Sequence, residues 1–293
     1  MSEFAKPVKA TAPSWGGKRA RAMDGVTLLR RVVGACLAQI QPNVDAIALG
    51  SDDPEHVHQL RIGLRRLRSG VRGLRPFAGG LPIGWEAAVM PVFEALGEAR
   101  DRVVLSTTIA PALRKAGAAV PDIDTPSRRE GAALRRRVSG ADFKHVLREL
   151  AAFADAAHPA TDDGPGQGLA HLVASLRKLA RQVKRGARDF DALPFERRHE
   201  VRKRLKRLRY LAEFAAPAFE RAEVKAWLRR VAPAQDALGR HVDLALAERR
   251  FAALAESDPD ALFAAGWLHA KAGDAARSAR KSLERLREAT PFW

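Results

Sequence analysis

Apolar residues recur with the period of about 3.6 residues that marks an amphipathic helix, along almost the whole chain after residue 24. Alanine, leucine and arginine, which favour helices, dominate this part, and alternating β-branched runs are missing. The pattern predicts an all-α fold. We expect helix breaks at 41–43, 50–54, 79–82, 120–127, 158–168, near Pro194, near Pro217 and at 256–260.

The same pattern predicts how the chain is organised. Residues 1–24 are rich in Pro, Gly, Ala and Lys without a repeating apolar pattern, and we interpret them as a flexible basic leader. The break at 158–168 nearly bisects the rest, which predicts a first helical repeat at 25–157, a linker at 158–168 and a second helical repeat at 169–293. Asp52 or Asp53 before Pro54 is typical of a helix N-terminus, and this helix is expected to run to Pro76.

Residues 58–77 contain six arginines and no acid. At about 100° per residue, one sector of this helix is cationic and the next is apolar. The cationic sector holds His58, Arg61, Arg65, Arg68, Arg72 and Arg75, and the apolar sector holds Leu60, Leu64, Leu67, Val71 and Leu74. A solvated basic helix usually interleaves acids for support. Their absence indicates that an anionic ligand supplies the counter-charge.

A second copy of this pattern follows 141 residues later, where residues 199–218 match residues 58–77. The match pairs His58 with His199, Arg61 with Arg202, Arg65 and Arg66 with Lys206 and Arg207, and Arg68 with Arg209. At an offset of 142, residues 227–243 match residues 85–101, so that Leu96, Gly97 and Asp101 coincide with Leu238, Gly239 and Asp243. One duplicated helical unit explains both matches.

Composition narrows the class of partner. Lys and Arg number 51 against 34 Asp and Glu, which gives a net charge of +17 and favours a polyanion: nucleic acid, an anionic membrane surface or polyphosphate. The single cysteine excludes a disulfide framework and a cysteine-based metal cluster. No signal core and no stretch of roughly 18 apolar residues is present, so we expect a soluble cytoplasmic protein without a membrane partner.

The motif His-x-x-Arg-x-x-x-Arg-Arg-Leu-Arg, followed by Leu-Gly-x-x-Arg-Asp, resembles the CHAD domain, the "conserved histidine α-helical domain". It is matched by His58, Arg61, Arg65, Arg66, Leu67 and Arg68 with Leu96, Gly97, Arg100 and Asp101. The second copy is similar at His199, Arg202, Lys206, Arg207, Leu208 and Arg209 with Leu238, Gly239 and Asp243, and the whole resemblance covers about residues 25–290. The second copy departs from the pattern at Val242, where the first has Arg100, and His241 is a candidate substitute. The Glu-x-Glu-x-Lys motif of the often associated CYTH domain is missing, so the chain looks like a stand-alone member.

The resemblance implies two pseudo-symmetric helical bundles that face each other across a basic central groove or pore. It also implies non-catalytic binding of inorganic polyphosphate and association with polyphosphate granules. The candidate binding residues are His58, Arg61, Arg65, Arg66, Arg68, Arg72, Arg100, His199, Arg202, Lys206, Arg207 and Arg209. Further candidates on neighbouring helices are Arg31, Lys178, Arg181 and Arg185.

Polyphosphate has many charges and no bases, so a receptor needs a row of cations and little else. Nucleic-acid binding stays open as the main alternative, although aromatics make up 6% of the chain and none lies in the two cationic sectors. A phosphohydrolase is a weaker alternative, since Arg198 and His199 are followed by Glu200 where a phosphatase motif has glycine. We expect no catalytic residues, no cofactor and no metal site; His56 and His58, two residues apart, point in different directions on a helix.

Overall fold

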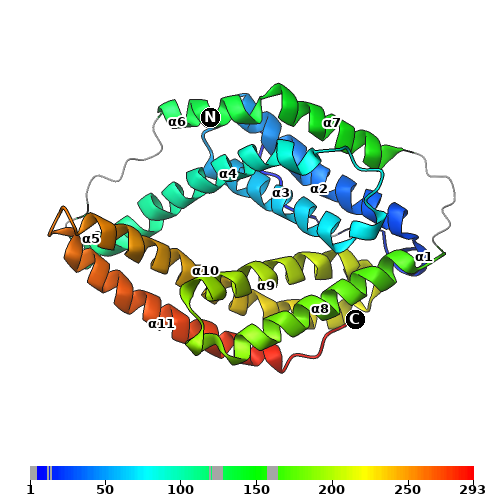
Figure 1. Cartoon of the computed structure of the whole chain (residues 1–293). Helices are drawn as coiled ribbons and strands as arrows, with labels where there is room; N and C mark the ends of the chain where they lie inside the picture. The colour runs from blue at the N-terminus through cyan, green and yellow to red at the C-terminus, as the bar shows by residue number, and fades with distance from the viewer. Residues whose placement is uncertain (1–4, 12, 14, 119, 121–127, 157–163) are drawn as a thin grey trace. The chain divides into compact units, whose positions relative to one another are not determined.

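The structure, a computed structural model, describes residues 5–11, 13, 15–118, 120, 128–156 and 164–293, and every regular element in these ranges is helical (Figure 1). The α-helices are α1 (Lys18–Ala22), α2 (Gly25–Ala48), α3 (Pro54–Gly73), α4 (Trp85–Val104), α5 (Ala110–Lys115), α6 (Arg128–Val138), α7 (Ala141–Asp155), α8 (Gln167–Arg188), α9 (Phe195–Ala215), α10 (Arg221–Leu254) and α11 (Ala261–Arg287). A π-helical turn (Leu105–Ile109) joins α4 to α5, and 3₁₀ turns occupy Arg75–Phe77, Phe190–Ala192 and Ala216–Ala218. The prediction of an all-α fold is confirmed. None of the described helices combines the length and the apolar character needed to cross a bilayer.

Local sequence signals account for most helix ends. The Asp53 carboxylate accepts a hydrogen bond from the Glu55 backbone N–H (2.8 Å), with Pro54 in the first turn, which confirms the predicted start of α3. The predicted break at 41–43 is wrong, because α2 continues through Pro42 to Ala48. Ile40 and Val44, on either side of this proline, are fully buried. Their burial outweighs the hydrogen bond that proline cannot donate.

Two compact units make up the chain, and each is described by itself. Unit 1 comprises residues 1–101, 126–176 and 210–219, and unit 2 comprises residues 102–125, 177–209 and 220–293. The units therefore do not follow the consecutive order of the predicted repeats, whose boundaries stay a prediction. Most of the predicted break at 120–127 and of the predicted linker at 158–168 lies outside the described residues, and α8 already begins at Gln167.

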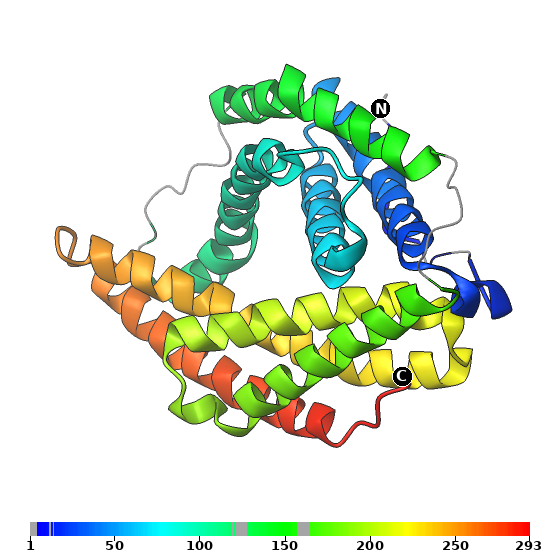
Figure 2. The same ribbon diagram turned by 45° about the vertical axis from the view of Figure 1, so that its right-hand side comes forward.

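Unit 1 is built on α2 and α3, with α7 packed along α2 (Figures 1 and 2). Three glycines of α3 allow close packing, because an added Cβ would lie 2.7 Å from Ile40 at Gly63, 2.5 Å from Val32 at Gly70 and 2.7 Å from Leu211 at Gly73. The apolar sector predicted for this helix is buried throughout. Burial of this sector fixes the rotation of α3 and thereby the direction of its basic side chains.

Unit 2 is built on the long antiparallel pair α10 and α11, which lie side by side in both views (Figures 1 and 2). Near the turn between these helices an apolar cluster joins Phe251 and Leu268 to Leu105 and Leu113 from the chain segment after α4. On α9 the predicted apolar residues Val201, Leu205, Leu208 and Ala212 are buried. Burial of this apolar sector fixes the rotation of α9 and thereby the direction of its basic side chains, as it does on α3.

The predicted flexible leader is held to unit 1 at several points. The backbone N–H of Val8 donates to the Asn43 side chain (3.3 Å), whose Nδ2 donates back to the Val8 carbonyl (2.9 Å). The Gly17 N–H donates to the Pro217 carbonyl (3.0 Å), and α1 follows directly. These hydrogen bonds satisfy backbone polar groups in the described part of the leader, whose flexibility stays a prediction.

Candidate functional site

The basic sector of α3 lies along the seam between α3 and α4. We call His58, Arg61, Arg65, Arg68 and Arg72 the α3 row. Leu60, Leu64 and Leu67 are fully buried beneath it, whereas Arg61, Arg65 and Arg68 are half-buried and Arg72 is exposed. The helix thus offers a partly exposed line of cations on a rigid, buried support.

Phe93 of α4 is the centre of this arrangement. The guanidinium groups of Arg61, Arg65 and Arg68 lie 5.0, 5.7 and 5.1 Å from the centre of its ring. Arg61 also donates from Nη1 to the Phe93 carbonyl oxygen (3.3 Å). Attraction between the cations and the ring face offsets part of the repulsion among three neighbouring arginines.

Glu86, two turns before Phe93, supplies a carboxylate to the end of the α3 row. Its Oε1 accepts from Arg68 Nε (2.8 Å) and from Arg72 Nη2 (2.7 Å). Partial burial opposes ionisation of Glu86, but the hydrogen bonds and positive charges of the two arginines outweigh it and lower the pKa of this carboxyl group. The carboxylate is therefore a standing counter-ion for Arg68 and Arg72.

The Leu-Gly pair of each motif has a structural reason. Leu96 and Leu238 are fully buried, and the glycine that follows each lies beneath an arginine of the facing helix. An ideal Cβ would lie 2.1 Å from Nη1 of Arg61 at Gly97, and 3.9 Å from Nε of Arg202 at Gly239. The missing side chain at Gly97 lets the Arg61 guanidinium rest on α4.

On α9 the second set of cations follows the seam with α10. We call His199, Arg202, Lys206 and Arg209 the α9 row. Arg202 pairs with Asp243 (3.3 Å), and Arg209 Nη1 donates to the Gln235 side-chain oxygen (3.0 Å). Burial, helped by the charges of Lys203 and Arg202, lowers the pKa of His199 below its ordinary value.

Arg66 differs from the other predicted binding residues. Its side chain is 3% exposed, forms an ion pair with Glu213, and lies 4.9 Å from the ring centre of Phe214 and 5.8 Å from that of Tyr210. The positive charge of Arg66 lowers the pKa of the buried Cys36 thiol, but burial has the larger effect and raises this pKa to about 12. The contacts of Arg66 are those of a core ion pair, so it is not part of the α3 row.

The remaining predicted residues lie apart from this pattern. Arg100 is half-buried on α4, Arg207 is half-buried on α9, and Arg31 and Lys178 are exposed on α2 and α8. His241, the candidate substitute for Arg100, is buried, and its Nδ1 lies 3.1 Å from the Ala272 carbonyl oxygen. It packs within unit 2 and does not replace Arg100. Arg181 and Arg185 line a pocket between α8 and α11.

Glu86 and Phe93 contact the α3 row but were not among the residues predicted from the sequence. With Gly97 they are spaced seven and four residues apart, which places all three on one face of α4. This spacing predicts that the face of α4 that carries Gly97 extends three turns back to Glu86. The spacing did not show which helix the face contacts, because that contact is tertiary.

The chain is similar to one known protein family in sequence and to two solved structures in fold. The CHAD domain profile matches residues 31–252. The chain is similar in structure to the CHAD domain from the plant Ricinus communis, with 23% identity, a TM-score of 0.75, and coverage of 95% of this chain and 96% of that chain. It is also similar to PptA from Streptomyces chartreusis, with 19% identity, a TM-score of 0.63, and coverage of 90% of this chain and 98% of that chain. No curated protein matches. The structural likenesses support the helical fold, and since the matching profile spans both basic rows and both Leu-Gly seams, the chain belongs to the CHAD domain family.

Proposed function

We propose that this protein binds inorganic polyphosphate through the α3 row and the α9 row. The observation that carries the proposal is the α3 row itself: half-buried and exposed cations at spacings of three and four residues, fixed on a buried helix face. Membership in the CHAD family, which is associated with polyphosphate-related proteins, supports the choice among polyanions.

The α3 row has the dimensions of an extended phosphate chain. Fourteen residues separate His58 from Arg72, a rise of about 21 Å along the helix axis. Neighbouring cations one turn apart can each contact a different phosphate group. Arginine offers forked N–H donors that match two phosphate oxygens at once, which favours phosphate over single-point anions.

The α3 row is poorly suited to nucleobases. Single-stranded nucleic acids are bound by stacking of bases on open aromatic faces. Phe93 of α4 is an aromatic residue that packs against this row, and three guanidinium groups already lie over or beside its ring. An anion without bases uses the arginines and needs no aromatic face.

We further propose that binding is not followed by hydrolysis. A general base must accept a proton near the working pH. Glu86 is a carboxylate that contacts the α3 row, and its lowered pKa makes it a counter-ion and a poor base. Binding without turnover fits a protein that attaches to or organises polyphosphate granules, and we propose that role in the cell.

A charge-reversal experiment tests the proposal. Among the described residues Arg65 makes no ion pair, so Arg65→Glu combined with Lys206→Glu places a negative charge in each row while the ion pairs of Arg68 with Glu86 and of Arg202 with Asp243 keep both partners. We expect the affinity for long-chain polyphosphate to fall by about 3 kcal/mol, or roughly 100-fold. Phosphate release from the pure wild-type protein is measured in parallel and is expected to be absent.

Arg135→Glu with Arg137→Glu is the matched control, because both arginines are exposed on α6 and the net charge changes equally. This control should bind polyphosphate almost as well as wild type. Equal losses in the two double variants would show that net charge alone drives binding. Displacement of polyphosphate by duplex DNA or RNA at equal phosphate concentration would favour the nucleic-acid alternative.

A further inference from the structure

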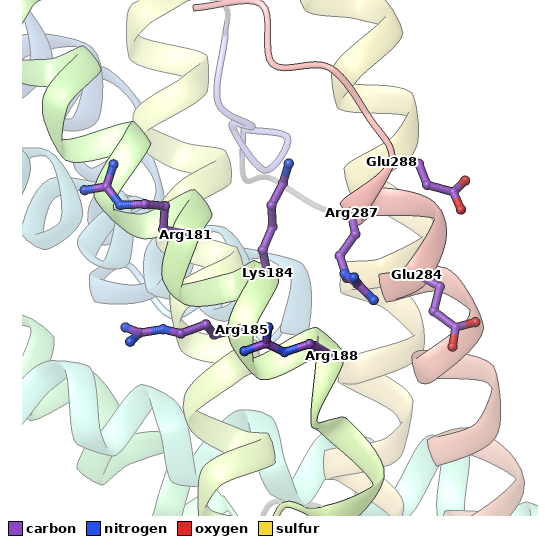
Figure 3. Close-up of a pocket in the computed structure, with 7 residues that line it drawn as sticks. All are labelled: Arg181, Lys184, Arg185, Arg188, Glu284, Arg287 and Glu288. Carbon is purple, nitrogen blue, oxygen red and sulfur yellow. The ribbon is translucent and has the colours of Figure 1, made fainter.

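Unit 2 contains a pocket that neither basic row uses. It lies between α8 and α11, has a volume of about 880 Å³, and is lined by the cations Arg181, Lys184, Arg185, Arg188 and Arg287 (Figure 3). The other lining residues are Glu284 and Glu288, so all of its lining side chains are charged. The α9 row contacts α10 instead, through Asp243 and Gln235.

Most cations of this pocket have no partner in the described structure. With the residues that the structure describes, Arg181, Lys184, Arg185 and Arg287 form no ion pair or hydrogen bond, whereas Arg188 pairs with the adjacent Asp189 (3.3 Å). Nearby, cations that stabilise the fold are paired. Arg280 of α11 contacts Asp191 (3.3 Å) and Glu284 (2.6 Å).

Figure 3 shows how the side chains are disposed. Lys184 extends between the two helices, and Arg287 lies on the side of α11 that faces α8, while Glu284 and Glu288 are turned to the other side of α11. Arg181 and Arg185 extend from the side of α8 that faces away from α11. Among the described residues no hydrogen bond holds these long arginine side chains, so rotation about their own bonds can bring them toward an anion beside Lys184.

Helix-end electrostatics do not account for the whole cluster. Basic residues in the last turn of a helix are favoured by the negative end of its dipole. Arg185 and Arg188 occupy the last turn of α8, and Arg287 that of α11. Arg181 and Lys184 lie before the last turn, where the effect of the helix dipole is weak. The dipole therefore does not account for basic residues at these two positions.

The repeated helix pattern does not require these cations either. The buried faces of α2 and α8 match at an offset of 143, which pairs Leu29 with Leu172, Val33 with Leu176, and Ile40 with Val183. Under this match Lys184 corresponds to Gln41 and Arg188 to Asp45. The same buried face thus forms without the positive charge, so the charge on α8 serves something other than folding.

We propose that this pocket is a second anion site, which binds a compact inorganic oligophosphate such as triphosphate. Five cations line the pocket, and their forked and point-charge donors match the several oxygens of linked phosphate groups, so we expect a ligand that consists of phosphate groups. Cations from two helices surround a volume with room for several phosphates, in contrast to the single-file α3 row. The class of ligand in this inference rests on the proposed function, and the location of the site rests on the pocket between α8 and α11.

The test is calorimetric titration with inorganic triphosphate. Lys184→Gln combined with Arg287→Gln removes the two cations that lie between α8 and α11, and Arg229→Gln with Arg230→Gln on the exposed face of α10 is the control with equal charge loss. We expect triphosphate affinity to fall about tenfold in the pocket variant and less than about twofold in the control. Thermal unfolding of both variants checks that the fold is intact.

Long-chain polyphosphate is titrated against the same variants and against Arg65→Glu with Lys206→Glu. If the pocket variant loses triphosphate affinity but keeps its affinity for long chains, the pocket binds a free oligophosphate. If it loses affinity for both ligands, the pocket binds the end of a long chain. Equal triphosphate affinity in the pocket variant and its control overturns the inference. The inference is also overturned if Arg65→Glu with Lys206→Glu abolishes triphosphate binding while the pocket variant does not; that result leaves the proposed function intact. If long-chain polyphosphate still binds tightly to Arg65→Glu with Lys206→Glu, the proposed function is wrong.

Discussion

Replacing Gly97 and Gly239 by alanine tests the seam between the basic helices and their neighbours. Both glycines lie inside helices, in matching motifs, yet their surroundings differ. A methyl group at Gly97 would lie 2.1 Å from the Arg61 guanidinium, a distance that forces Arg61 to move. At Gly239 the nearest atom, Nε of Arg202, is 3.9 Å away, which is an ordinary contact.

The magnitudes follow from these distances. Glycine to alanine inside a helix stabilises by about 1 kcal/mol, and Gly239→Ala should gain that amount. In Gly97→Ala the arginine loses its hydrogen bond to the Phe93 carbonyl and its place on the ring, which costs about 1 to 2 kcal/mol and cancels the gain. We expect Gly239→Ala to melt about 2 to 4 °C above wild type and Gly97→Ala at or below wild type.

Thermal unfolding followed by circular dichroism measures this difference, and polyphosphate titration adds a second readout. Gly97→Ala should weaken binding because it displaces a member of the α3 row, whereas Gly239→Ala should leave binding unchanged. If both variants are stabilised equally and bind equally well, Arg61 does not rest on Gly97, and the structural reason given for the Leu-Gly motif is wrong.

Three further predictions concern the interior. Arg66→Met removes one side of a buried ion pair and should lower the free energy of unfolding by about 3 kcal/mol in urea titrations, whereas Arg65→Met should change it by less than about 0.5 kcal/mol. Burial lowers the pKa of both His199 and His241, so the unfolded chain binds more protons below pH 6.5, and the melting temperature should fall between pH 7.5 and pH 5.5; replacing both histidines by glutamine should flatten this fall, and a rise on acidification would contradict it. Cys36 is buried with its pKa raised to about 12, so a thiol reagent at pH 8 should label it in urea and leave the native protein unlabelled.

The features that the sequence predicted well depend on local chemistry. The helical period, the Asp53 and Pro54 start of α3 and the buried leucines beneath the basic sector are all set by residues within a few positions of one another. Pro42 shows where local reasoning fails. A proline signals a break, but burial of the residues around it keeps α2 continuous, and that burial depends on helices far along the chain.

The candidate site was predictable as a set of cations and not as a set of contacts. Helical phase alone placed Arg61, Arg65 and Arg68 on one side of a helix, and these arginines do share one seam. Arg66, adjacent in sequence, lies on the buried side, where Glu213 meets it from a segment almost 150 residues away. The sequence motif does not distinguish an arginine that faces a ligand from one that faces the core.

The lack of acids at residues 58–77 says less about the ligand than the sequence alone suggested. This lack indicated that a ligand provides the counter-charge, but Glu86 and Glu213 reach α3 from other elements and neutralise part of its charge. A lone phosphate at Arg68 or Arg72 must displace the Glu86 carboxylate. Its binding free energy is therefore only the difference between a phosphate and a carboxylate held by the same donors. Arg65 contacts the Phe93 ring and forms no ion pair with a described carboxylate, so a phosphate there displaces none of them. A chain that first engages Arg65 brings its next phosphates to Arg68 at high effective concentration, where they compete with Glu86 far better than a free phosphate does. Even within the α3 row, Glu86 therefore makes binding favour chains of several phosphates over single ones.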